Sequence, residues 1–241
     1  MSHKPIVLFD FDGVVITQKS LEYTASKFLK KSFYNWRNTD NLRLIDLARM
    51  FEEADSKNKI KALLRIVKVY KTYIPSLWKR IMFFLKFRRT YPKYEMYETL
   101  KPNIVSVLTK LKRYGFVLGI VSNTSGSRLD RFRKKLELDK YFSIYISRDD
   151  SPYRKPNPFP IYVALKEIKN SLNISINKEL VYYIGDLPPD IQCAKNAEVN
   201  SIALLSGHGT QESLENSNPS FIIKDIKNIL EIEPIKKFLL D

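Results

Sequence analysis

Cysteine is nearly absent from this chain of 241 residues, which has only Cys193. A single cysteine cannot form an internal disulfide, so the fold must rely on the core that its 44% of hydrophobic residues can build. The sequence also lacks the layout of a signal peptide and long apolar runs, since residues 81–85 are flanked by Arg80 and Lys86. A membrane-spanning helix needs roughly 20 apolar residues. We therefore expect a cytoplasmic protein without a membrane partner.

Acidic residues are scarce in one part of the chain. The whole sequence has 41 Lys and Arg against 26 Asp and Glu, a net charge of +15. Residues 17–95 hold 19 of the basic residues but only 7 of the acidic ones, so most of the excess lies there. Both tryptophans, Trp36 and Trp78, belong to the same segment. This composition predicts a separate structural unit with a basic surface.

Hydrophobic periodicity divides the chain in a similar way. Residues 4–9 are typical of a buried strand, whereas residues 20–94 space their apolar side chains three and four positions apart, as helices do. After Pro102 the two patterns alternate. The expected helices are residues 104–114, 129–138, 160–170 and 191–197, and the expected strands are residues 116–121, 142–147, 180–184 and 201–205. This alternation predicts an α/β fold with a doubly wound parallel sheet and a helical insertion after the first strand.

Polar residues follow three of the expected strands directly. In doubly wound sheets ligands bind outside the carboxyl ends of the strands, so we expect these residues to lie together. The candidates are Asp10 and Asp12 after the first strand, Ser122 and Asn123 after the strand at 116–121, and Asp186 and Asp190 after the strand at 180–184.

Each candidate alone has an ordinary structural explanation. An Asp-Gly pair is common in turns, a hydroxyl such as that of Ser122 caps helices, and a loop lysine such as Lys155 is usually a solvated charge. Their expected convergence at one edge of the sheet is what indicates a site. Several carboxylates buried together are costly unless a cation compensates them, and a hard cation such as magnesium prefers oxygen ligands. The pattern therefore predicts a magnesium site.

Four segments, in order along the chain, resemble the four motifs of the haloacid dehalogenase-like hydrolase superfamily. They are DFDGVV at residues 10–15, SNT at 122–124, KPNP at 155–158 and GDLPPD at 185–190. The likeness covers roughly residues 1–16 and 100–230, and the insertion is similar to the cap of the phosphoglycolate phosphatase and β-phosphoglucomutase branch. The resemblance implies a Rossmann-like core of residues 1–16 and 97–241 and an all-helical cap domain of residues 17–96.

The resemblance also implies a mechanism. Asp10 would be the nucleophile that forms an aspartyl-phosphate, and Asp12 would be the general acid for the leaving alcohol and then the base for water. The carboxylates of Asp10 and Asp186 and the backbone carbonyl of Asp12 would hold magnesium. Because the dehalogenase branch lacks an aspartate at the position of Asp12, the resemblance implies phosphoryl transfer rather than dehalogenation.

Phosphate recognition is implied for a second group of residues. Ser122, the backbone N–H of Asn123 and Lys155 would bind phosphoryl oxygens, while Asp190 would orient either the metal shell or Lys155. Two places depart from the common pattern of the branch: Thr17 replaces an aspartate, and residues 187–189 (Leu-Pro-Pro) replace a small polar residue. Neither departure removes a reacting group.

We expect a magnesium-dependent phosphatase that acts on a small anionic phosphate monoester, with phosphoglycolate as the first candidate. A basic cap would favour such substrates, although the same charges also fit a solvated helical face. Two alternatives stay open: a phosphomutase of the same branch, and a protein whose basic, aromatic-bearing helices bind nucleic acid. The sequence does not indicate an oligomeric state.

Overall fold

Strand β1 (Ile6–Phe9) lies inside the sheet of the computed structural model, which describes residues 4–17, 19 and 76–240. Its four side chains are completely buried, Val7 and Phe9 in the core on one face and Ile6 and Leu8 in the core on the other. Successive side chains of a strand point to opposite faces, so a strand covered on both faces must be apolar throughout. For this reason the first strand is a continuous apolar run rather than an alternating one.

Six parallel strands of the described residues form one sheet in the order β3-β2-β1-β4-β5-β6. After β1 they are β2 (Val117–Val121), β3 (Ile144–Ile146), β4 (Val181–Gly185), β5 (Asn200–Leu204) and β6 (Phe221–Ile223). The chain builds outward from β1 to one edge, returns to β4 beside β1, and builds outward to the other edge. The strand order therefore reverses between β1 and β4, where such sheets bind ligands.

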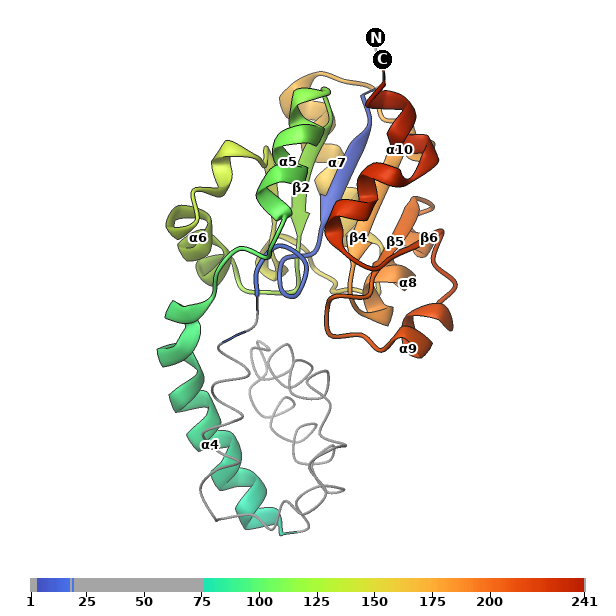
Figure 1. Ribbon diagram of the computed structural model, residues 1–241. Coiled ribbons are helices and arrows are strands. Elements are labelled where there is room, and N and C mark those ends of the chain that lie inside the picture. Colours follow the sequence, from blue (N-terminus) through green and yellow to red (C-terminus); the bar gives the residue numbers. More distant parts are fainter. Residues whose placement is uncertain (1–3, 18, 20–75, 241) are drawn as a thin grey trace. The chain divides into compact units, whose positions relative to one another are not determined.

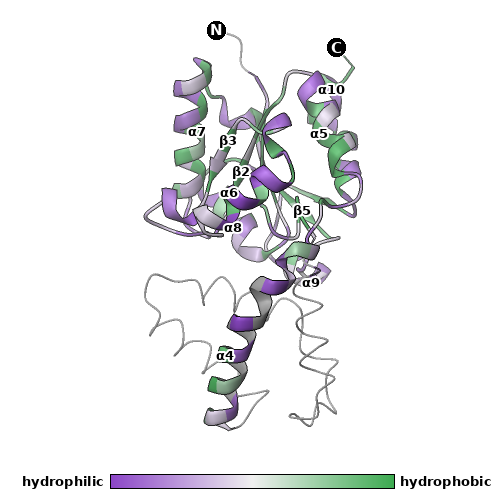
Figure 2. Ribbon diagram, turned by 90° about the vertical axis from the view of Figure 1, so that its left-hand side faces the viewer, coloured by the Kyte–Doolittle hydropathy of each residue, from purple (hydrophilic) through white to green (hydrophobic). Residues whose placement is uncertain are grey.

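Helices cover both faces of the sheet (Figure 1). One face carries α5 (Ile104–Arg113), α6 (Gly126–Lys135), the 3₁₀ segment η6 (Ile226–Glu231) and α10 (Glu233–Phe238), and the other carries α7 (Phe159–Leu172) and α8 (Pro188–Asn196). Figure 2 shows hydrophobic and hydrophilic stretches alternating along α7, as expected of a helix with one side on the core. The predicted doubly wound α/β fold is confirmed.

The predicted elements differ from the observed ones mainly at helix starts. Helices α6 and α8 begin at Gly126 and Pro188, three residues before their predicted starts, because polar residues and prolines in a first turn carry no apolar periodicity. Elements α9 (Gln211–Glu215), β6 and α10 are not among the predicted ones. Each spans only three to six residues, too few to establish a period.

The chain divides into two compact units, Met1–Thr17 with Thr99–Asp241 and Gln18–Glu98. Most of the predicted cap, residues 20–75, lies outside the described residues, so its all-helical fold stays a prediction. The described part of the second unit contains α4 (Leu77–Tyr94), which begins after the N-cap residue Ser76, and a 3₁₀ turn (Glu95–Tyr97). No helix within residues 4–17, 19 and 76–240 is long and apolar enough to cross a membrane.

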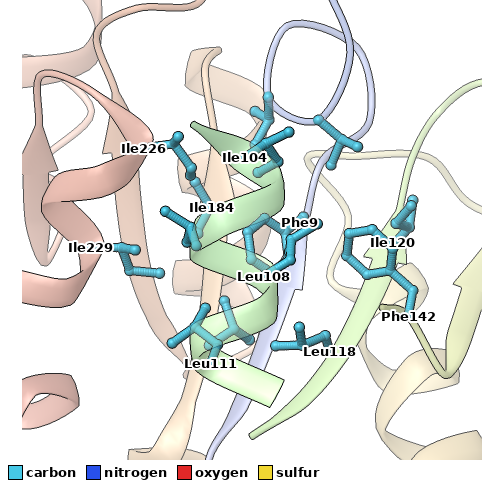
Figure 3. Close-up of a cluster of buried hydrophobic side chains, with 14 of the residues drawn as sticks. Phe9, Ile104, Leu108, Leu111, Leu118, Ile120, Phe142, Ile184, Ile226 and Ile229 are labelled. Atoms are coloured by element: carbon cyan, nitrogen blue, oxygen red, sulfur yellow. The ribbon is translucent and has the colours of Figure 1, made fainter. Parts of the chain in front are cut away.

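The core on the α5 face fixes the carboxyl ends of the central strands. Leu108 and Leu111 of α5 lie over Phe9 of β1 and Ile184 of β4 (Figure 3). All four side chains are fully buried. Close packing of this kind fixes the helix relative to the two strands that precede Asp10 and Asp186.

Truncation of this core should destabilise the whole first unit. We expect Leu108→Ala to lower the free energy of unfolding by about 2–5 kcal/mol, because a buried leucine leaves a cavity that the structure fills only in part. Val105→Ala on the same helix is the control: its side chain is 40% exposed, and a change within about 0.5 kcal/mol is expected. Urea denaturation of both variants measures the difference, and equal midpoints would contradict this description of the core.

Candidate active site

Asp10 occupies the point where the strand order reverses. It follows β1 directly, and its backbone N–H donates to the carbonyl of Ile184 on β4 at 2.8 Å. Gly13 then turns the chain with φ at +79°, a left-handed conformation that glycine adopts without strain. The carboxylate of Asp10 is thereby held, nearly buried, between the two central strands.

Lys155 is a buried cation at the centre of the cluster. Its Nζ donates to Oδ1 of Asp10 at 2.7 Å, to Oδ1 of Asp190 at 2.6 Å and to the hydroxyl of Tyr183 at 2.9 Å. An ammonium group has three protons, and all three are used here. The Tyr183 hydroxyl in turn donates to the carbonyl of Val121 at 2.9 Å. Lys155 is thus not a solvated surface charge.

Asp190 is fixed by the start of helix α8. Its Oδ2 accepts a hydrogen bond from the backbone N–H of Leu187 at 3.0 Å, while Oδ1 holds Lys155. Gly185 gives it room, because a Cβ atom there would lie 2.0 Å from Cβ of Asp190. Asp190 thus contacts Lys155, and the two orienting roles predicted for it stay predictions.

Asp186 follows β4 and is completely buried. Its Oδ2 accepts a hydrogen bond from the backbone N–H of His208 at 2.8 Å and lies 2.6 Å from Nδ1 of the same residue. Its Oδ1 is buried and has no hydrogen-bond partner among the described residues. Burial lowers the pKa of His208, but the hydrogen bond and the charge of Asp186 outweigh it and leave the pKa above its usual value.

The loop that follows β2 joins the cluster through backbone and amide contacts. The backbone N–H of Ser122 donates to the carbonyl of Ile146 at 2.8 Å, and Ser122 Oγ accepts from the N–H of Thr124 at 3.2 Å. Asn123 Oδ1 accepts from the backbone N–H of Lys155 at 3.2 Å, which ties the two loops together. Helix α6 begins a few residues later, so the loop combines hydroxyls with a helix N-terminus, a combination that suits an anion.

Asp12 is paired with an arginine that the motifs do not include. Nη1 of Arg128 lies 2.8 Å from Oδ2 of Asp12 and 3.0 Å from Oγ1 of Thr124. The guanidinium also sits 5.0 Å from the centre of the Phe132 ring, a cation–π contact that holds it in place. Oδ1 of Asp12 is buried without a hydrogen-bond partner in the described part of the chain.

The donor atoms of this cluster fit a hard cation. Asp10, Asp186 and Asp190 each offer an oxygen, and these atoms lie within 4.8 Å of one another. Burial raises the pKa of Asp10 well above its usual value, although Lys155 opposes the shift, and burial likewise raises the pKa of Asp190. Burial thus disfavours the charged form of both carboxylates even beside Lys155, and the unpartnered oxygen of Asp186 can take one further ligand. A set of carboxylate oxygens is what hard divalent cations prefer.

Sequence motifs locate most of this cluster but not all of it. The structure brings Asp10, Asp186, Asp190 and Lys155 into the buried cluster, and one hydrogen bond ties Asn123 to Lys155. Ser122 and Asp12 make their side-chain contacts with Thr124 and Arg128 instead. His208, Arg128 and Tyr183 are not predicted. His208 has one signal, its place between two glycines in the loop after β5.

Known proteins share this sequence pattern. The sequence model of the haloacid dehalogenase-like hydrolases matches residues 7–204. A protein of Caldanaerobacter subterraneus subsp. tengcongensis, provisionally named pyrophosphatase PpaX, is 30% identical over 139 residues, 58% of this chain and 60% of its own length. The phosphoglycolate phosphatase of Escherichia coli is 30% identical over 131 residues, 54% of this chain and 50% of its own. The chain thus matches only about half to three-fifths of these relatives.

Solved structures share the fold. A crystal structure from Haemophilus somnus, provisionally identified as a phosphoglycolate phosphatase, has a TM-score of 0.66 with 20% sequence identity and covers 97% of this chain and 99% of its own. A subfamily IA haloacid dehalogenase-like hydrolase from Geobacter sulfurreducens has a TM-score of 0.60 with 18% identity, over 95% and 96% of the two chains. At these identities the likeness concerns the fold.

The one thiol near the cluster should be inert. Cys193 is fully buried in α8, its Sγ donates to the carbonyl of Asn157 at 3.1 Å, and burial raises its pKa to about 12. At pH 8 only about one thiol in ten thousand would be ionised, and the thiolate is the reactive form. We therefore expect Ellman's reagent to label the native protein at least about 100-fold more slowly than the protein in guanidinium chloride. Labelling of the folded protein within minutes would contradict this placement.

Proposed function

Because the chain belongs to the haloacid dehalogenase-like hydrolase family, we propose that it is a magnesium-dependent phosphatase that hydrolyses a small phosphate monoester through an aspartyl-phosphate on Asp10. The observation that carries the proposal is the buried contact of Lys155 with Asp10 and Asp190, at 2.7 and 2.6 Å. This contact holds a carboxylate nucleophile beside a fixed positive charge, the pairing that attack on an anionic phosphoryl group requires.

The proposed reaction has two displacements. A carboxylate oxygen of Asp10 forms a bond to phosphorus while the bond from phosphorus to the ester oxygen breaks, and Asp12 gives its proton to the departing oxygen. Water then attacks the phosphorus of the aspartyl-phosphate, Asp12 takes the proton from that water, and the carboxylate of Asp10 leaves. Ser122 and the backbone N–H of Asn123 bind phosphoryl oxygens during both steps, and Lys155 binds one in place of an acceptor that its ammonium group contacts in the structure.

The cation site belongs to the same proposal. The carboxylates of Asp10 and Asp186 and the backbone carbonyl of Asp12 would hold magnesium, which when bound supplies positive charge between the nucleophile and the phosphate. The buried, unpartnered Oδ1 of Asp186 supports this assignment. Asp190 contributes by keeping Lys155 in place, as its contact with Nζ indicates.

Two substrates are proposed for the first tests. Phosphoglycolate, a monoester, is suggested by the Escherichia coli relative, and pyrophosphate, an anhydride whose leaving group is phosphate, by the Caldanaerobacter relative. The basic composition of residues 17–95 supports a small anionic substrate in either case. A cytoplasmic location stays part of the proposal.

Replacement of the nucleophile should abolish turnover. We expect Asp10→Asn to lower phosphate release from phosphoglycolate or pyrophosphate by at least about 1,000-fold, because an amide cannot form the covalent intermediate. Asp139→Asn, the same chemical change at a side chain that is 59% exposed, should leave the rate unchanged. A colorimetric assay of inorganic phosphate measures both variants. Equal rates for Asp10→Asn and the wild type would refute the assignment of Asp10.

Removal of the cation should also stop the reaction. We expect a chelator to abolish phosphate release and added magnesium to restore it, since Asp10 and Asp190 share the one ammonium group of Lys155 and an entering phosphate adds further negative charge. Asp186→Asn should raise the magnesium concentration for half-maximal rate by more than about 10-fold, because it removes one of the anionic ligands. Asp130→Asn, whose side chain is 60% exposed, is the matched control. Undiminished activity in chelator would count against a metal-dependent mechanism.

A further inference from the structure

The two carboxylate oxygens of Asp186 have different surroundings. Oδ2 is close to two nitrogen atoms of His208, the backbone N at 2.8 Å and the imidazole Nδ1 at 2.6 Å. Because the partner is a carboxylate, we assign the proton of a neutral imidazole to Nδ1, so that both nitrogens donate. Oδ1 is fully buried and has no hydrogen-bond partner among the described residues. One oxygen is therefore saturated, and the other is left for a ligand.

The loop at residues 206–209 is built to approach Asp186 closely. The N–H of Gly209 donates to the backbone carbonyl of Asp186 at 2.9 Å. A Cβ atom at Gly207 would lie 2.1 Å from Cβ of Asp186, so a larger residue would push the loop away. Lys101 anchors the start of the loop, since its Nζ donates to the carbonyl of Ser206 at 2.5 Å. These contacts fix the position from which His208 reaches the carboxylate.

Gly13 lies against the contact between Asp186 and His208. A Cβ atom there would lie 2.2 Å from Oδ2 of Asp186 and 2.4 Å from Nδ1 of His208. The turn after β1 thus packs directly on the hydrogen bond between these two residues. The geometry leaves little room for the Asp186 carboxylate to rotate away from His208.

We propose that His208 is a positioning residue that restricts Asp186 to ligation through Oδ1 alone and thereby makes the site selective for magnesium over calcium. This inference rests on the proposed function, because it assigns a cation to the cluster. His208 itself acts through Asp186 and touches neither the cation nor the substrate in the proposed arrangement.

The selectivity follows from the coordination chemistry of the two ions. Magnesium keeps about six ligands at about 2.0–2.1 Å and takes one oxygen from each carboxylate, whereas calcium takes about 6–8 ligands and readily uses both oxygens of one carboxylate. Two-oxygen ligation by Asp186 would require Oδ2 to lose its contacts with His208. Calcium would therefore lose one of its usual ligands in this site, and magnesium would lose none.

Two substitutions at one position separate the hydrogen bond from the bulk of the side chain. Asparagine can place its Nδ2 where Nδ1 of histidine stands, because both atoms are bonded to Cγ, whereas leucine has the same branching without a donor. We expect His208→Leu to bind magnesium about 10–100-fold more weakly, as is usual when a partner that orients a metal ligand is removed. Its affinity for calcium should fall much less, so that the preference for magnesium drops. His208→Asn should keep both the affinity and the preference of the wild type.

Isothermal titration of the metal-free proteins with magnesium chloride and with calcium chloride measures these affinities without any turnover. Thermal unfolding checks that each variant is folded, and His208→Phe replaces His208→Leu if the latter is not. Lys101→Met tests the anchor of the loop and should lower the preference for magnesium in the same direction, to a smaller extent.

The outcomes distinguish the inference from the function on which it rests. If the ratio of magnesium affinity to calcium affinity is the same in His208→Leu as in the wild type, whether or not both affinities fall, the role of His208 is wrong while the magnesium site stands. If the wild-type protein binds no magnesium and Asp186→Asn does not change the titration, the proposed cation site itself is wrong. A falling ratio in His208→Leu that His208→Asn restores supports the inference.

Discussion

The buried ammonium of Lys155 is the contact on which the arrangement of the site depends. It joins Asp10 after β1, Asp190 at the start of α8 and Tyr183 within β4, and all of these groups are buried. Breaking a buried ion pair from one side leaves an uncompensated charge and costs about 3–5 kcal/mol. The three segments are therefore held to one geometry. Such rigidity would serve the role that we propose for Asp10, because a nucleophile must meet phosphorus along a fixed line.

This contact is possible only because of the topology. Lys155 and Asp10 are 145 residues apart in sequence, yet parallel strands bring their carboxyl ends to one edge of the sheet. The reversal of strand order between β1 and β4 opens space there for side chains rather than for a crossover connection. Backbone hydrogen bonds set the spacing of β1 and β4, and the apolar core of α5 packs against both strands, so packing supports the site in addition to its polar contacts.

The central fold and the motif residues could be predicted from sequence because both have local signals. A buried strand is a continuous apolar run, and Asp10 and Asp186 are marked by following such runs directly. His208 and Arg128 have no comparable signal. The side chain of His208 contacts Asp186, 22 residues away in sequence, and that of Arg128 contacts Asp12, 116 residues away. The short elements after residue 205 are not predicted for a related reason, since a strand of three residues such as β6 has no measurable period.

The charges of the site are divided in a way that bears on its function. Asp10 and Asp190 share one ammonium group, Asp186 is held by His208, and Asp12 by Arg128. In each of the last two pairs one carboxylate oxygen is bound and the other is buried without a partner among the described residues. A buried polar atom left unsatisfied costs about 1–3 kcal/mol, so each of these two oxygens lowers the stability of the fold. A group from outside the chain can satisfy such atoms, and the cation and the phosphate ester of the proposed function are two such groups.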